Sequence, residues 1–444
     1  MRRLLILGLL FGGMTLILPL GAEGQGARTL LTFGFLILAA YTVGEIAATL
    51  GLPKIVGYLL AGVLFGPSAL NTVTVEGVDR LTPVNDLAIA LIAFLAGAEL
   101  RWGEVRERGV LLLKMMTTEL VVTFVALATA IWLLRDMLPF LRDAPPEIVI
   151  AAAILFAAIA IVHSPAVTMA LLSETGARGP VAKTTLGIVL LADVAVVLFF
   201  SAALAVARAV APPDGLVEVA SVGGILWEIL GALVVGTALG GAVSVYLRFV
   251  GRELTLFAVL VAFFGLEIAR LTHVEVLLTL LTAGFVTENT SPEGDDLRHA
   301  LERSAAPIFV VFFALSGAKI HLPDVIPLLP LVVPIAAVRA SAIWAGTRLG
   351  GRWAGAPPEE RRLVWMGLVS QAGVAIGLAA IVAEAYGAMG EQLRNLLLAL
   401  IAVNETVGPI LFRRALSRSG EAVAGSTDAQ VAGREPVAGG VQGG

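Results

Sequence analysis

Long apolar segments joined by short polar loops recur along almost the whole of this sequence. About thirteen of them follow Arg28, and most approach the roughly 20 apolar residues that a helix needs to cross a bilayer. They cover residues 29–50, 54–70, 84–100, 109–135, 147–172, 182–207, 219–248, 253–270, 273–287, 303–318, 324–347, 361–386 and 391–415. This pattern predicts an all-α polytopic membrane protein with about 13 transmembrane helices in one domain, residues 28–418.

The composition agrees with a bilayer as the main solvent. Hydrophobic residues make up 58% of the 444 positions and charged residues only 14%, against roughly 25% charged residues in a soluble domain. The net charge of −4 forms no basic stripe, so we expect no nucleic-acid partner. Cysteine is absent and the four histidines are scattered, which excludes disulfides and gives no zinc-type cluster. The sequence also has no His-Glu-x-x-His motif, so we expect neither an enzyme nor a bound cofactor.

The two ends of the chain differ from the part between them. Residues 1–27 begin with two arginines and an apolar run, which fits either a signal peptide or an extra N-terminal helix. If residue 28 lies outside, most lysines and arginines fall in inside loops, as the positive-inside rule requires. The sequence therefore predicts a multi-pass protein of the cell inner (plasma) membrane with a cytoplasmic C-terminus. Residues 419–444 lack large apolar side chains and are predicted to be a disordered cytoplasmic tail.

Two of the apolar runs are interrupted in a related way, seven helices apart. Residues 161–165, ending in Pro165, interrupt the fifth run, and residues 370–377, with Gln371 and Gly373, interrupt the twelfth. Irregular backbone at membrane depth is tolerated only where it faces protein or a water-filled cavity. A pair of broken helices at corresponding positions of two halves indicates the ion site of a transporter. The alternative is that Pro165 only kinks its helix and the glycines only allow close packing.

Asp193 is the most isolated charge in the sequence. It has no charged residue for nine positions before it and fourteen after it, in the middle of an apolar run. A carboxylate at that depth must be neutralised, either by a proton or by a hard cation bound through oxygen ligands. These two states exclude each other, and competition between them is the chemistry that a cation/proton exchanger needs. The alternative is a structural hydrogen bond or salt bridge to a neighbouring helix.

Three further polar residues are candidates for the same site. Arg339 lies in mid-run and stays protonated, so it needs a carboxylate or the C-terminus of a helix. Glu119 is a candidate charge partner, because its helix and that of Asp193 both fall within residues 109–207, which we expect to form one group of helices. His163 can titrate near neutral pH, although beside a helix break it is also suited to a simple hydrogen bond. The other acids near span ends are expected to be solvated or hydrogen-bonded: Glu45, Glu99, Glu228, Glu267, Glu384 and Glu405.

Together these residues resemble the monovalent cation:proton antiporter superfamily, in particular its second branch, which includes bacterial sodium/proton and potassium-efflux exchangers. The resemblance covers roughly residues 29–415 and rests on the order and spacing of several short motifs. They are residues 52–67 (LPKIVGYLLAGVLFGP), 95–100 (LAGAEL), 163–165 (HSP), Asp193, 283–285 (AGF), 312–317 (FFALSG), Arg339 and 408–409 (GP).

The resemblance implies an inverted repeat in which two broken helices cross beside Asp193. Residues 29–100 and 219–318 would form a scaffold and dimerisation unit, and residues 109–207 and 324–415 a mobile core that moves like an elevator. Asp193, Ser164 and the backbone near His163 would hold the transported monovalent cation. A homodimer in the lipid bilayer, exchanging Na⁺ or K⁺ for H⁺, is the expected assembly.

The sequence also departs from the family pattern. Relatives that exchange two protons per cation usually carry two adjacent acids, whereas Ala192 precedes Asp193 here. We therefore expect electroneutral exchange of one proton per cation. The choice between Na⁺ and K⁺ stays open, because cavity size and ligand number decide it. The alternative function is a non-transporting membrane sensor or channel-like protein that keeps the antiporter fold.

Overall fold

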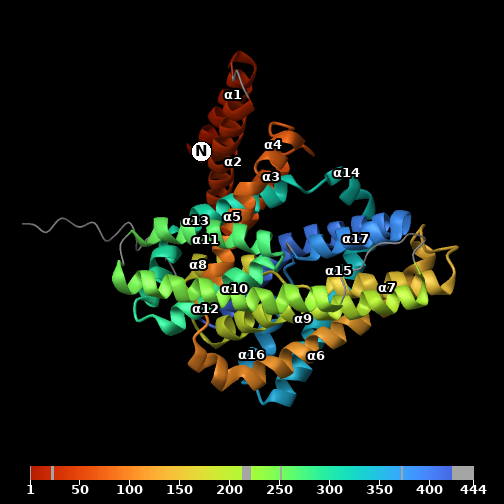
Figure 1. Ribbon diagram of the computed structural model, residues 1–444. Coiled ribbons are helices and arrows are strands. Elements are labelled where there is room, and N and C mark those ends of the chain that lie inside the picture. The colour runs from red at the N-terminus through yellow and green to blue at the C-terminus, as the bar shows by residue number, and fades with distance from the viewer. Residues whose placement is uncertain (1, 22–24, 213–221, 251–252, 372–373, 423–444) are drawn as a thin grey trace, which may run out of the picture.

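The computed structural model describes residues 2–21, 25–212, 222–250, 253–371 and 374–422, and contains no strand within these ranges (Figure 1). The α-helices are α1 (Arg2–Gly21), α2 (Gln25–Thr49), α3 (Lys54–Phe65), α4 (Val75–Arg80), α5 (Thr82–Ala98), α6 (Trp102–Leu134), α7 (Pro146–Ala160), α8 (Pro165–Thr175), α9 (Pro180–Val210), α10 (Val222–Phe249), α11 (Leu254–Thr272), α12 (Val276–Thr290), α13 (Gly294–Ala318), α14 (Leu322–Val325), α15 (Leu329–Ala354), α16 (Pro358–Leu363) and α17 (Val374–Arg418). Short 3₁₀ segments lie at 135–137, 326–328 and 364–367.

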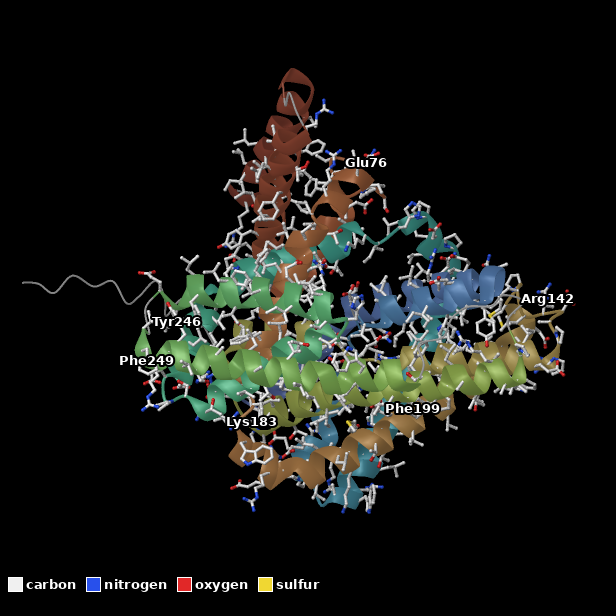
Figure 2. The ribbon with its side chains drawn as sticks, in the orientation of Figure 1. Glu76, Arg142, Lys183, Phe199, Tyr246 and Phe249 are labelled. Carbon is white, nitrogen blue, oxygen red and sulfur yellow. The ribbon has the colours of Figure 1, made fainter. Side chains whose placement is uncertain are left out.

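Every predicted apolar run contains helix, which confirms the all-α fold. In the described ranges, eight helical stretches are long and apolar enough to cross a membrane, or nine if the bent pair in α13 is one span. The total of thirteen spans stays a prediction. Large apolar side chains cover the outside of these helices; Phe249, for example, is 79% exposed (Figure 2). Such a surface is stable only against lipid or another apolar surface.

Two predicted runs differ from single helices. The fifth run is split into α7 and α8 by residues 161–164. The twelfth run begins with α16 and a 3₁₀ segment and becomes α-helical again only at Val374. The predicted loop before the last run is only a kink, because α17 continues through Gly387, whose φ of 52° suits glycine.

The N-terminal 27 residues contain a helix that packs on the next one. Helix α1 lies against α2, and both project beyond the other helices at the top of Figure 1. The Arg3 guanidinium donates to the Glu45 carboxylate at 3.0 Å, and Met14 is buried. This packing fits the extra-helix alternative; cleavage as a signal peptide stays untested.

The helices pack mainly in two groups. Helices α2, α3, α5 and α10 to α13 contact one another, and helices α6 to α9 and α15 to α17 contact one another. Contacts between the groups run chiefly through α8, which lies against α3, α5 and α13. The groups coincide with the residues expected for scaffold and core; their roles as static and mobile units stay predictions.

Close approach of α15 and α6 depends on two glycines four residues apart. A Cβ on Gly346 would lie 2.6 Å from the Glu119 Cα, and one on Gly350 would lie 2.8 Å from the Met115 Cα. Small residues at this spacing let two membrane helices pack backbone to backbone. The contact brings α6, which carries Glu119, against the helix that carries Arg339.

The chain after α17 returns to the start of α9. The Glu421 carboxylate accepts hydrogen bonds from the backbone N–H groups of Val181 and Ala182, at 2.8 and 2.9 Å. A negative charge at a helix N-terminus satisfies free N–H groups and complements the helix dipole. The predicted disordered tail therefore does not begin at residue 419, and its residues 423–444 lie outside the described ranges.

Candidate ion site

The first break is an unwound segment with a new helix start, and not a proline kink. Helix α7 ends at Ala160, and α8 begins at Pro165 with Ser164 as its N-cap. The Ser164 hydroxyl accepts the N–H of Val167 at 3.2 Å. Proline is favoured at the first position of a helix, since its missing N–H would have no helical partner there. The residues of the motif therefore fold as the broken helix that the sequence predicts.

Arg339 joins the two breaks through backbone carbonyls. Its fully buried guanidinium donates to Ala160 O at 2.6 Å and Val162 O at 2.8 Å in the first break. It also donates to Val369 O at 2.5 Å in the second break. The cation thus faces the C-terminal end of α7, where helix carbonyls carry partial negative charge. Of the two predicted partners, the structure places Arg339 against a helix C-terminus.

Gln371 strengthens the same crossing. Its side-chain amide donates to Ala160 O at 3.0 Å, and Asn404 donates to the Gln371 Oε1 at 2.7 Å. Gly408 makes room for the second break, because a Cβ there would lie 2.1 Å from the Ser370 Oγ. Gly373, the other predicted residue of this break, lies outside the described ranges.

His163 and Glu119 form a separate buried pair. One ring nitrogen of His163 lies 3.1 Å from the Glu119 carboxylate and the other 2.7 Å from Leu368 O. Thr123 donates to the second carboxylate oxygen of Glu119 at 2.8 Å. Neither His163 nor Glu119 lines the cavity of Asp193. One ring nitrogen of His163 thus contacts the second break and the other contacts α6, so His163 as an ion ligand stays a prediction. Glu119 pairs with His163 and makes no ion pair with Arg339 among the described residues.

Asp193 lies in a cavity of about 450 Å³ between the two helix groups, called here the Asp193 cavity. The walls are mostly apolar and come from α5, α8, α9, α10, α12, α13 and α17. Ser164 lines this cavity, as do Pro165 at the start of α8 and Val374 at the start of α17. Within the described part of the chain, the Asp193 carboxylate makes no hydrogen bond or ion pair. The cavity therefore combines a free carboxylate, a hydroxyl and two helix N-termini.

Two more acids face the Asp193 cavity, Glu228 on α10 and Glu275 before α12. Glu275 is the N-cap of α12: its carboxylate accepts the N–H of Leu278, and its own N–H donates to Glu228 O at 3.2 Å. Sequence reasoning did not single out Glu275, and it placed Glu228 among acids at span ends. An acid directly before the apolar run at 276 was the available signal. No three acids or histidines in the described ranges are arranged to hold one metal ion together.

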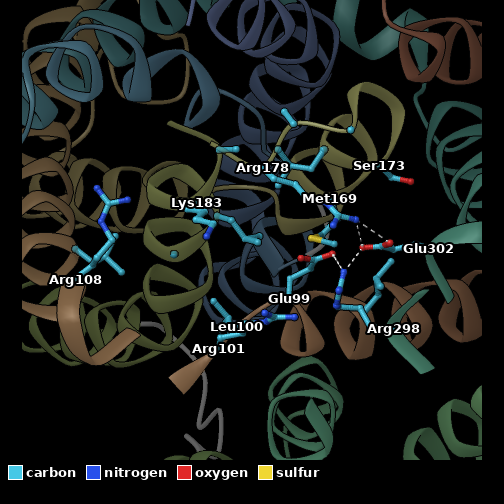
Figure 3. A pocket seen from close by; sticks show the side chains of 18 residues that line it. Glu99, Leu100, Arg101, Arg108, Met169, Ser173, Arg178, Lys183, Arg298 and Glu302 are labelled. Carbon is cyan, nitrogen blue, oxygen red and sulfur yellow. Dashed lines mark hydrogen bonds and ion pairs between the residues drawn. The ribbon is translucent and has the colours of Figure 1, made fainter. Parts of the chain in front are cut away.

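A second cavity of about 390 Å³ lies on the predicted inner side and is rich in paired charges (Figure 3). Arg298, only 4% exposed, donates to Glu302 at 2.5 Å and to Asp295, and lies 3.6 Å from Glu99. Arg178 reaches Glu302 at 3.2 Å. We call these five residues the Arg298 cluster. Glu99, expected to be solvated or hydrogen-bonded near a span end, is one of its acids.

Comparison with known proteins decides the family. The sequence matches the family described as sodium/hydrogen exchanger, transmembrane, over residues 33–418. This chain belongs to the sodium/hydrogen exchanger family. The match covers all the helices that meet at the two breaks, and it confirms the resemblance to cation/proton antiporters. Its members are transporters, which agrees with the expectation that the chain is not an enzyme.

Single relatives support the same conclusion. The chain is 25% identical over 409 residues to the Na(+)/H(+) antiporter NhaS5 of Synechocystis sp., a match that covers 87% of this chain. It spans about half, 54%, of the length of that relative. Two structures of the sodium proton antiporter MjNhaP1 from Methanocaldococcus jannaschii match with TM-scores of 0.63 and 0.69 at 16% identity. These matches cover 88% of this chain and 96% and 97% of MjNhaP1, and they show that the exchanger fold is shared.

Proposed function

We propose that this protein exchanges sodium ions for protons across a membrane and that both ions compete for Asp193. One observation carries the proposal: the Asp193 carboxylate, which has no partner among the described residues, faces a cavity at the boundary of two helix groups. A carboxylate inside a mostly apolar cavity is stable only when protonated or when it holds a cation. Family membership and the names of its relatives favour Na⁺ as that cation.

The cavity supplies what the exchange needs on the protein side. The Ser164 hydroxyl and the Asp193 carboxylate are oxygen donors of the kind that hard cations prefer. The starts of α8 and α17 point positive helix ends toward the site, which stabilises the carboxylate when it has lost its proton. Arg339 adds a fixed positive charge nearby, and its bonds to Ala160 O and Val162 O hold the first break open.

Glu228 and Glu275 are proposed to attract the cation into the Asp193 cavity. Both line the cavity from helices of the other group, on the side predicted to be outside. Negative groups at the wall of a low-dielectric cavity raise the local concentration of cations. They would guide the cation into the cavity but would not move with it. Of the three acids, only Asp193 lies on a helix of the core, α9.

Alternating access is proposed to occur by an elevator-like shift of α6 to α9 and α15 to α17 against the other helices. Asp193 would then meet the outer cavity in one state and the cavity of the Arg298 cluster in the other. With Ala192 beside Asp193, one proton would move per cation, and exchange would be electroneutral. A homodimer in the inner membrane with a cytoplasmic C-terminus is part of the same proposal, and K⁺ is the second candidate cation.

Flux measurement tests the exchange. The purified protein is reconstituted in liposomes with a trapped pH dye, and Na⁺ or K⁺ is added outside. We expect cation-dependent proton movement in the wild type, none in Asp193→Asn, and normal movement in Glu384→Gln, whose side chain is exposed on α17. Proton movement that survives in Asp193→Asn overturns the site, and a wild type without movement supports the non-transporting alternative. Exchange that changes with membrane potential overturns electroneutrality.

A further inference from the structure

A buried acid lies in a cavity that the proposed exchange at Asp193 does not use. Glu405 on α17 is only 6% exposed and lines a cavity of about 260 Å³. In the described ranges its carboxylate has neither a hydrogen bond nor an ion pair. The neighbouring residue, Asn404, is bound to Gln371 at the second break, which fixes the turn of helix from which Glu405 projects.

An oxygen donor from the other helix group faces the same cavity. Asn85 on α5 is also 6% exposed, and its Oδ1 is buried without a hydrogen-bond partner among the described residues. Buried polar atoms are nearly always satisfied, so the buried Asn85 Oδ1 and the Glu405 carboxylate that faces the same cavity need a common explanation. A ligand that accepts electron pairs from both atoms provides one.

We propose that Glu405 and Asn85 bind a monovalent cation at a second site, separate from Asp193. One carboxylate and one amide oxygen match a singly charged hard cation, whereas Ca²⁺ would require six or more oxygen ligands and Mg²⁺ near-ideal octahedral coordination. Asp324, another acid of this cavity, is exposed to solvent and lies 2.9 Å from the His321 ring, so we do not count it among the buried ligands.

Lys319 offers a different explanation of how the charge of Glu405 is neutralised. Lys319 lines the same space but is exposed, and no ion pair of 4 Å or less joins it to Glu405. A lysine that bends inward would neutralise Glu405 without any bound ion. The two explanations differ in one property, since only a bound cation makes the stability of the fold depend on the kind of cation in solution.

The position of this site predicts its effect. Glu405 belongs to the helices proposed to move and Asn85 to those proposed to stay, so an ion between them favours the arrangement seen here. The cavity shares Ile89, Phe312 and Gly377 with the Asp193 cavity, which makes it an adjoining compartment on the same side. Occupancy of the second site should therefore slow exchange without being part of it.

The test removes the first site and measures binding at the second. Thermal unfolding of Asp193→Asn in detergent is followed in NaCl, KCl and choline chloride at constant ionic strength. We expect Na⁺ or K⁺ to raise Tm by a few degrees relative to choline. The rise should vanish in Asp193→Asn with Glu405→Gln, shrink in Asp193→Asn with Asn85→Ala, and persist in Asp193→Asn with Glu384→Gln.

Three outcomes overturn the second site. They are no cation-dependent rise in Asp193→Asn, a rise that Glu405→Gln and Asn85→Ala leave unchanged, and a rise that depends on Lys319, tested by Lys319→Ala. If Glu405→Gln does not fold, the Asn85→Ala comparison decides alone. Because every protein in this series carries Asp193→Asn, the result does not depend on whether Asp193 transports ions, which the flux measurement decides.

Discussion

The Asp193 cavity and the Arg298 cluster hold charge in opposite ways. Asp193 has no partner in the described part of the chain, whereas Arg298 contacts Glu302, Asp295 and Glu99. An unpaired carboxylate in an apolar cavity is unfavourable unless an ion from solution neutralises it, while a paired network needs no such ion. The difference separates the site at which we propose ion exchange from an ion-pair network that joins α5, α13 and Arg178, which precedes α9.

Arg339 should produce the largest loss when it is changed. Arg339→Gln leaves the buried carbonyl oxygens of Val162 and Val369 without their donor and Ala160 O with Gln371 alone, at a cost of about 2 kcal/mol or more in the free energy of unfolding. We expect a large drop in Tm and no measurable exchange. Arg339→Lys keeps the charge but cannot reach all three carbonyls, so its Tm should lie between the Tm of the wild type and that of Arg339→Gln. A normal Tm in Arg339→Gln would contradict the role of this cation in holding the breaks.

Arg298 should affect stability more than transport chemistry. Arg298→Gln removes the common partner of Glu99, Asp295 and Glu302, and of Glu288 at 3.9 Å, and should cost about 1–3 kcal/mol, because Arg298 is buried. The apparent affinity for Na⁺ in flux measurements should change little. Arg80→Gln, at an exposed position on α4, is the matched control and should leave Tm unchanged. Loss of Na⁺ affinity in Arg298→Gln with an unchanged Tm would contradict this, because the Arg298 cluster would then contribute to ion binding and not to stability.

Glu275 should affect cation affinity more than stability. Glu275→Gln keeps an oxygen that can cap α12 but removes a negative charge from the Asp193 cavity. We expect the Na⁺ concentration for half-maximal exchange to rise about three- to tenfold, with Tm nearly unchanged. Glu76→Gln, an exposed acid on α4, should alter neither quantity (Figure 2). An unchanged Na⁺ dependence in Glu275→Gln would remove this acid from the entry path.

Glu421 should give the smallest effect. Glu421→Gln weakens the cap on α9 by removing the charge that faces two backbone N–H groups. The expected loss is about 0.5–1 kcal/mol, measured as a small decrease in Tm, with unchanged exchange per folded protein. A change in exchange without a change in Tm would instead give this residue a part in transport.

The sequence allowed prediction of those features that depend on local pattern. Apolar runs located the helices, and the acid isolated within a run, Asp193, proves to line a cavity. The paired interruptions located both breaks. All three are encoded by residues close together in the chain.

Features that depend on contacts between distant helices could not be predicted in the same way. The partners of Arg339 are backbone carbonyls, which any residue type carries, so no residue pattern marks them. The pairing of His163 with Glu119 and the approach of Glu275 to the Asp193 cavity join segments 44 and more residues apart. Glu405 illustrates the same limit, because its burial follows from the cavity and not from its place near a span end.

Proton release on cation binding tests the competition at Asp193 most directly. The measurement uses unbuffered detergent solution and Glu405→Gln protein, so that the second proposed site contributes nothing. Adding Na⁺ should release about one proton per chain from the Glu405→Gln protein. The double variant that also carries Asp193→Asn should release none. Equal release from both proteins, or Na⁺ binding to the Asp193-containing protein without proton release, would contradict the account.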